Sequence, residues 1–204
     1  TAADAERLRV HGAECIALVK LPESDYEMQV ERIAARAAVD CTLPAHRHDH
    51  RRIVLPAHRT PRSGVHIGDY LNYWAEAGRR FAESLTWGRQ EAILVLGTEE
   101  CMLPGLWIGK ALEEQGYENV VFHATTRSPI GIGDAKDYPV RAGWRIRSFY
   151  EAARATYIYN LQPYQHVLIV SDAGEERAAA VQSLLCALMA CGCIDAVYLT
   201  SKGE

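Results

Sequence analysis

The sequence AILVLGTEE, residues 92–100, places five consecutive apolar residues directly before a glycine and three polar residues. A continuous apolar run of this length is typical of a strand buried on both faces of a parallel sheet. The glycine and the polar residues after it are typical of the loop that leads into the next helix. The segment therefore predicts a strand, loop and helix unit.

The same unit recurs through the second half of the chain. Strands are expected at 120–124, 166–170 and 196–200, and helices at 69–86, 103–115 and 177–191. Alternation of this kind predicts an α/β fold with a Rossmann-like, mostly parallel sheet and helices on both faces. Residues 131–155 are glycine-rich and mixed, and no element is assigned to them.

The first third of the chain has a different composition. A helix is expected at 2–12, a strand at 15–19 and another helix at 24–38. Residues 41–66 contain five His, five Arg and three Pro, which predicts a linker or lid with a short strand at 53–55. Residues 67–204 are then the Rossmann-like domain. Because the chain opens on Thr1, we expect a fragment of a longer polypeptide.

Composition limits the partners of this protein. The net charge of −4 gives no overall basic footprint, so nucleic acid is not the favoured partner. No apolar run reaches the roughly 18 residues that span a bilayer, so no membrane partner is expected. The six cysteines favour buried thiols in a reducing, cytoplasmic compartment over a disulfide framework. The alternating histidines at 46, 48 and 50 suit a solvated linker or an anion contact better than a metal, so no metal site is assigned.

Ligands of open parallel sheets bind beyond the carboxyl ends of the strands, and three polar loops are expected there. The first loop contains Gly97, Thr98, Glu99 and Glu100. Its two carboxylates suit sugar hydroxyls or a divalent cation such as Mg²⁺ better than a bare phosphate. Alternatively, they only complement the dipole of the following helix.

The second loop contains Thr125, Thr126, Arg127 and Ser128, and the third contains Asp172. Hydroxyls beside a guanidinium suit a phosphate or carboxylate, whereas an acidic residue at a strand end suits ribose hydroxyls or Mg²⁺. The alternatives are a capped turn with an exposed Arg, and an acidic helix start.

Three motifs together resemble the TRSP domain family, named for its Thr-Arg-Ser-Pro signature. They are GTEE at 97–100 with Pro104, TTRSPI at 125–130, and Tyr159-Asn160 before a strand. The resemblance covers roughly residues 55 to 200. It implies a bacterial protein from tellurium-resistance or stress gene clusters, in which this domain follows a phosphoribosyltransferase-like domain. Residues 1–40 would then be the tail of that upstream domain, which is the expected protein partner.

A fainter similarity links residues 167–200 to the ribose-phosphate half of a type I phosphoribosyltransferase, so the fold is expected to be distantly phosphoribosyltransferase-like. In that family the corresponding loop has paired acidic residues and then Thr-Gly-x-Thr. Here Asp172 and Gly174 are present, but Glu175, Glu176 and Arg177 replace the threonines. Those carboxylates would repel the 5-phosphate that such a loop holds. A standard transferase reaction is therefore not predicted from this half.

Two functional hypotheses remain. In the first, the domain is an enzyme or half of one, a phosphoribosyltransferase-related transferase or hydrolase that handles a phosphorylated ribose or nucleotide-like ligand. In the second, it is a non-catalytic nucleotide- or RNA-binding regulatory module whose contact surface is the basic stretch 47–62. The candidate ligand-binding residues are Gly97, Thr98, Thr125, Thr126, Arg127, Ser128, Arg62 and Asn160, and the candidate catalytic residues are Glu99, Glu100 and Asp172.

Overall fold

The computed structural model describes residues 2–12, 36–56, 61, 64–173 and 177–201. The helix α1 (Ala2–Val10) forms as the sequence predicts. The expected strand at 15–19 and residues 24–35 of the expected helix lie outside the described residues. That helix does not extend over 36–38, because Arg36 instead makes an antiparallel bridge with Ile132.

A five-stranded sheet of parallel strands forms the centre of the domain, in the order β2-β8-β7-β3-β4. The strands are β2 (Arg51–Leu55), β3 (Ile93–Gly97), β4 (Val120–Ala124), β7 (His166–Ser171) and β8 (Asp195–Ser201). The predicted α/β fold with a mostly parallel sheet is therefore confirmed. The short strand expected at 53–55 is the edge strand β2, which pairs with β8.

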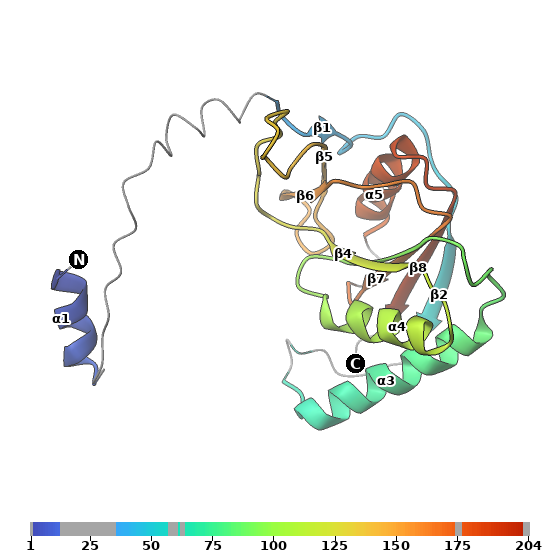
Figure 1. Ribbon diagram of the computed structural model, residues 1–204, viewed down its shortest axis with the longest axis horizontal. Helices are drawn as coiled ribbons and strands as arrows, with labels where there is room; N and C mark the ends of the chain where they lie inside the picture. Colours follow the sequence, from blue (N-terminus) through green and yellow to red (C-terminus); the bar gives the residue numbers. More distant parts are fainter. Residues whose placement is uncertain (1, 13–35, 57–60, 62–63, 174–176, 202–204) are drawn as a thin grey trace.

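Helices cover both faces of this sheet, as predicted. The helices α3 (Ile67–Ser84) and α4 (Leu103–Glu114) lie on one face and α5 (Ala178–Ala190) lies on the other (Figure 1). Along β3, Ile93 and Val95 face the first layer whereas Leu94 and Leu96 face the second, and all four are fully buried. This double burial explains why the strand is apolar at every position.

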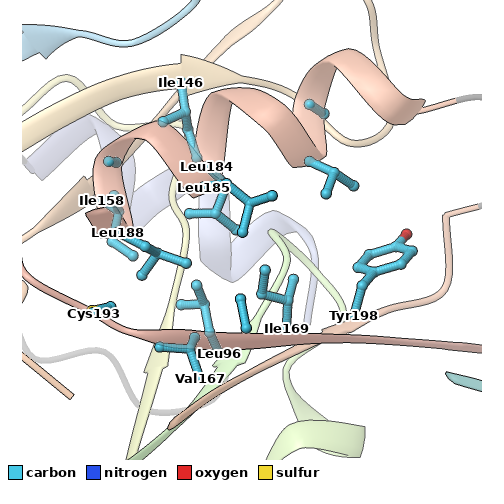
Figure 2. Close-up of a cluster of buried hydrophobic side chains, with 14 of the residues drawn as sticks. Leu96, Ile146, Ile158, Val167, Ile169, Leu184, Leu185, Leu188, Cys193 and Tyr198 are labelled. Carbon is cyan, nitrogen blue, oxygen red and sulfur yellow. The ribbon is translucent and has the colours of Figure 1, made fainter. Parts of the chain in front are cut away.

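A second, three-stranded sheet was not predicted. It has the order β1-β5-β6, from β1 (Val39–Asp40), β5 (Gly143–Arg147) and β6 (Ala155–Tyr159). Ile146 of β5 and Ile158 of β6 belong to the same apolar cluster as Leu184 and Leu185 of α5 (Figure 2). Because α5 packs on the main sheet as well as on the small sheet, its side chains are apolar around nearly the whole helix, as expected for a buried helix.

The five described cysteines are free thiols, as expected from their apolar surroundings. Burial raises the pKa of the Cys41 thiol to about 12, so it is protonated at neutral pH. None of the helices in the described ranges is both long enough and apolar enough to cross a bilayer.

Candidate functional site

The three polar loops that follow β3, β4 and β7 meet at one edge of the main sheet. They meet because β3 lies between β7 and β4, and all three strands run in the same direction. The hydroxyl of Thr98 donates to Ser171 Oγ at 2.9 Å, and the backbone N–H of Glu99 donates to Thr125 Oγ1 at 2.9 Å. The loops are therefore hydrogen-bonded to one another as well as adjacent.

Glu99 is the most constrained residue of this edge. Its side chain is fully buried and its backbone has a φ of 48°, in the left-handed region. One carboxylate oxygen accepts from Ser148 Oγ at 2.7 Å and from the backbone N–H of Phe149 at 3.0 Å. The other oxygen accepts from Arg154 Nη2 at 2.6 Å. Glu99 thus fixes the segment 148–154, between β5 and β6, against the end of β3.

Gly97 ends β3 where the chain turns sharply into this loop. A Cβ atom at this position would lie 2.7 Å from the carbonyl oxygen of Cys101 and 3.2 Å from the Cα of Met102. Both obstacles are backbone atoms, so they cannot move aside by changing a rotamer. The close approach explains why a glycine stands at the end of an otherwise apolar strand.

We expect Gly97→Ala to lower the free energy of unfolding by about 1–3 kcal/mol, the usual cost of overpacking. Gly109→Ala in α4 is the matched control, because its nearest contacts would be side-chain carbons at 3.8 and 3.9 Å. Alanine is the better helix former, so this control should be neutral or more stable by about 0.5–1 kcal/mol. Urea unfolding of both variants measures the difference. Equal effects would show that the turn after β3 tolerates a side chain.

Arg127 of the signature loop faces carboxylates. Its Nε lies 3.7 Å from Glu99 Oε2, and its Nη2 forms an ion pair with Glu100. Arg127 and Glu100 are both about half exposed, so this pair is open to solvent and exchangeable. An anion that binds here must share Arg127 with Glu100 or replace it.

The hydroxyls of the signature loop mainly hold the loop together. Thr125 Oγ1 accepts from the backbone of Glu99, and Thr126 Oγ1 accepts from the backbone N–H of Ser128 at 3.2 Å. The carbonyl of Ser128 accepts from the hydroxyl of Tyr159 at 2.9 Å. These contacts set the direction in which Arg127 projects.

Asp172, at the end of β7, pairs with a tyrosine. The hydroxyl of Tyr150 donates to Asp172 Oδ1 at 2.5 Å, and the same oxygen lies 3.1 Å from the carbonyl oxygen of Thr98. Burial, together with the neighbouring Cys101 and Asp172, raises the pKa of Tyr150 above its usual value. Tyr150 therefore stays protonated and acts as a hydrogen-bond donor at this site.

A pocket of about 570 Å³ opens beside these groups, within the range of small-molecule sites. Three of its lining residues were predicted from the sequence, namely Glu100, Arg127 and Asp172. The full lining comprises Pro61, Tyr70, Glu100, Cys101, Arg127, Tyr150, Glu151, Arg154 and Asp172. We call this the carboxyl-edge pocket.

The other candidate residues lie around this pocket or away from it. Gly97, Thr98 and Glu99 are buried at the end of β3 and do not line the pocket. Asn160 follows β6 and binds the backbone of Pro139, Arg141 and Ala142. Arg62 lies outside the described residues. Sequence reasoning did not select Glu151 or Arg154, which come from the irregular segment 131–155.

The donor groups of the pocket do not form a metal cage. Within the part of the chain that the structure describes, no three His, Cys, Asp or Glu side chains converge as metal ligands would. The carboxylates Glu100, Glu151 and Asp172 are instead interleaved with Arg127 and Arg154. Carboxylates accept hydrogen bonds from hydroxyl groups, and guanidinium groups donate them to anions. A cavity with both kinds of side chain suits these two contacts better than it suits a cation held by protein ligands alone.

An open parallel sheet with helices on both faces and a polar pocket at its carboxyl edge defines a Rossmann-like α/β class of domain. Residues 59–188 match the family model described as the TRSP domain C-terminal to PRTase_2, which covers more than half of the chain. The chain therefore belongs to the TRSP domain family, as the signature loop indicates. Comparison with curated proteins and with solved structures found no match.

Proposed function

We propose that this domain binds a phosphorylated ribose or nucleotide-like ligand in the carboxyl-edge pocket. The observation that carries the proposal is the lining itself, in which two guanidinium groups and three carboxylates surround one cavity. A ligand with both an anionic group and several hydroxyls uses both kinds of side chain. A bare anion would meet the carboxylates, and an uncharged sugar would leave the guanidinium groups unused.

Arg127 and Arg154 are the proposed phosphate contacts. Arg154 bonds Glu99 through Nη2 and Glu151 through Nη1, but its buried Nε has no hydrogen-bond partner among the described residues. Such an unpaired donor is costly, since a buried polar group normally has a partner. The Arg154 side chain is 27% exposed at the pocket wall, so a bound anion would contact its exposed part, while Arg127 would exchange Glu100 for the ligand.

Asp172, Glu100 and Glu151 are the proposed acceptors for ribose hydroxyls. Asp172 accepts a hydrogen bond from Tyr150, which holds the carboxylate at the wall of the carboxyl-edge pocket. The rings of Tyr150 and Tyr70 add apolar surface to the lining, which suits a ribose or a base.

If the domain is catalytic, Glu100 and Asp172 are the better candidates for a general base. Glu99 was proposed alongside them, but its carboxylate is saturated by three protein donors and fully buried. We assign Glu99 a positioning role. The reaction itself is left unassigned between a transferase and a hydrolase step.

The family position supports the wider proposal. The domain is C-terminal to PRTase_2, so a phosphorylated ribose is a chemically reasonable ligand for both parts of such a protein. We place this ligand binding in the making or handling of a nucleoside-like metabolite in a bacterial tellurium-resistance or stress pathway, in the cytoplasm. Residues 1–40 are proposed to come from the upstream domain and 41–66 to connect it to the pocket domain. Both segments also contact the pocket domain, because β1 pairs with β5 and β2 pairs with β8.

Calorimetric titration with ribose 5-phosphate, ribose and inorganic phosphate, each with and without Mg²⁺, tests the proposal. Ribose 5-phosphate should bind more tightly than either fragment. Arg127→Ala should weaken its binding by about 10-fold or more, the value of one charge-assisted contact. Asp172→Asn should weaken ribose 5-phosphate but leave phosphate unchanged.

Arg80→Ala is the matched control, because Arg80 is exposed on α3, pairs with Glu76 and does not line the carboxyl-edge pocket. It should leave all affinities within about twofold, since exposed ion pairs contribute little. If ribose 5-phosphate binds no better than phosphate, or if Arg127→Ala and Arg80→Ala have equal effects, the assignment is wrong.

A further inference from the structure

A second pocket, of about 490 Å³, lies between residues 44–52 and the first turns of α5. Its charged lining is entirely basic among the described residues. The lining comprises Pro44, Ala45, His46, Arg47, His50, Arg52, Arg177, Ala178, Ala179, Val181, Gln182 and Tyr198. None of these residues lines the carboxyl-edge pocket. We call it the basic pocket.

The segment that carries most of these basic side chains is held on α5 by specific hydrogen bonds. The side-chain amide of Gln182 accepts from the backbone N–H of His48 at 2.8 Å and donates to its carbonyl at 2.9 Å. Ser183 Oγ donates to the carbonyl of Cys41 at 2.8 Å. The pocket wall is therefore preformed, which lowers the entropic cost of binding.

Three elements direct positive charge into this pocket. Arg52 lies on β2, Arg47 lies in the preceding loop, and Arg177 is the residue before α5. Arg177 Nη2 donates to the carbonyl of Tyr150 at 2.7 Å, which fixes the guanidinium at the pocket wall. The helix α5 begins without a side-chain cap, so its dipole adds to the same field.

The pKa of the His50 imidazole is lowered in this pocket. Burial lowers the pKa of His50 first, and the charges of Arg47 and Arg52 lower it further, against the opposing effects of the His48 backbone and Asp49. The His50 ring also lies edge-on to Tyr198, with centroids 6.3 Å apart. A neutral imidazole here offers a hydrogen bond to an anion without adding to the repulsion between the arginines.

We propose that the basic pocket binds a phosphate group, as a second anion site separate from the carboxyl-edge pocket. Guanidinium groups from different elements match the oxygens of a phosphomonoester. The phosphate can belong to a free phosphorylated metabolite or to the 5′ end of an RNA chain. The inference does not depend on the proposed ribose site.

Charge reversal at two neighbouring positions of β2 tests the proposal. Arg51 and Arg52 carry the same charge and are both exposed, but side chains alternate along a strand, and only Arg52 lines the basic pocket. Inorganic phosphate is titrated while the NMR signals of the Gln182 side-chain amide and the His50 ring are followed. Arg52→Glu should weaken binding at these signals by about 10-fold or more, and Arg51→Glu by less than about twofold.

The source of the phosphate is read from a second titration with ribose 5-phosphate and with 5′-phosphorylated and 5′-hydroxyl oligoribonucleotides. Tighter binding of the 5′-phosphorylated oligonucleotide than of both other probes supports an RNA end. Tightest binding of ribose 5-phosphate supports a free metabolite. Arg127→Ala, in the carboxyl-edge pocket, should leave the Gln182 and His50 shifts unchanged.

The proposal is overturned if no phosphate probe shifts the Gln182 or His50 signals, or if Arg51→Glu and Arg52→Glu weaken binding equally. Equal weakening would mean that phosphate is attracted by the net charge of the protein and does not bind specifically in the basic pocket. If the basic pocket fails this test while ribose 5-phosphate still binds with dependence on Arg127, only the second site is wrong.

Discussion

Glu99→Gln should lower the free energy of unfolding by about 3 kcal/mol, the lower end of the cost of breaking a buried ion pair. The substitution keeps the size of the side chain but replaces one acceptor oxygen with an N–H donor. That donor would face either Arg154 or the N–H of Phe149, each of which needs an acceptor. We choose the lower end because Arg154 is partly exposed and keeps its second partner, Glu151.

Glu100→Gln is the matched control for this prediction. The two residues are adjacent in sequence and both pair with Arg127, but the Glu100 side chain is half exposed whereas that of Glu99 is fully buried. Loss of an exposed pair should cost less than about 1 kcal/mol. Urea unfolding of the two variants at neutral pH gives the comparison. A cost for Glu99→Gln as small as that for Glu100→Gln would show that Glu99 does not hold the segment 148–154 in place.

The consequence for ligand binding follows from the position of Arg154. Glu99 holds Arg154 at the wall of the carboxyl-edge pocket, so Glu99→Gln should also reduce affinity for ribose 5-phosphate. Arg154→Lys separates the two effects, because lysine keeps the charge but cannot reproduce the planar guanidinium contacts. Arg154→Lys should weaken the binding of ribose 5-phosphate while it changes the free energy of unfolding less than Glu99→Gln does.

The main sheet could be predicted because its strands carry their own signal. Residues 93–97 and 167–170 are buried on both faces, so they are apolar at every position, and the loops after these strands are polar. The expected meeting of these loops follows from parallel pairing alone. The geometry of the edge therefore matches the sequence-based expectation, even though its use by a ligand is a proposal.

The small sheet could not be predicted, because its strands lack such a signal. In β5, Trp144 and Ile146 alternate with Arg145 and Arg147, over a length of only five residues. Its pairing with β6 is antiparallel and its pairing with β1 joins residues that are about a hundred positions apart in the chain. These pairings, of which the one with β1 is long-range, set the position of Arg154, so a residue of the pocket depends in part on contacts that no local pattern contains.

Thr125 illustrates a different limit of sequence reasoning. A hydroxyl directly after a buried strand is an equally good phosphate donor or loop acceptor on chemical grounds. In the structure it accepts from the backbone N–H of Glu99, which has a left-handed φ and whose N–H would otherwise be unpaired within the sheet edge. Thr125 accepts a hydrogen bond within the sheet edge because the loop after β3 lies beside it. The sequence of the Thr125 loop does not reveal which strand is its neighbour.

Leu184→Ala should lower the free energy of unfolding by about 2–5 kcal/mol, as other fully buried leucine truncations do. Leu184 is fully buried on α5, in the cluster that joins Leu96 and Ile169 of the main sheet to Ile146 of the small sheet (Figure 2). The lost methyl groups would leave a cavity between the two sheets. Chemical denaturation measures the loss, and Ile194→Ala, at a side chain that is 78% exposed, should cost less than about 0.5 kcal/mol.

The same substitution tests whether the cluster supports the pocket. The small sheet carries the segment 148–154, and α5 is the layer that holds this sheet against the main one. A looser α5 should therefore weaken ribose 5-phosphate binding in Leu184→Ala even under conditions where the protein remains folded. If affinity is unchanged while stability falls, the hydrogen bonds of Glu99 alone suffice to hold Arg154 in position. In that case the pocket is anchored through the end of β3 and not through the apolar layer.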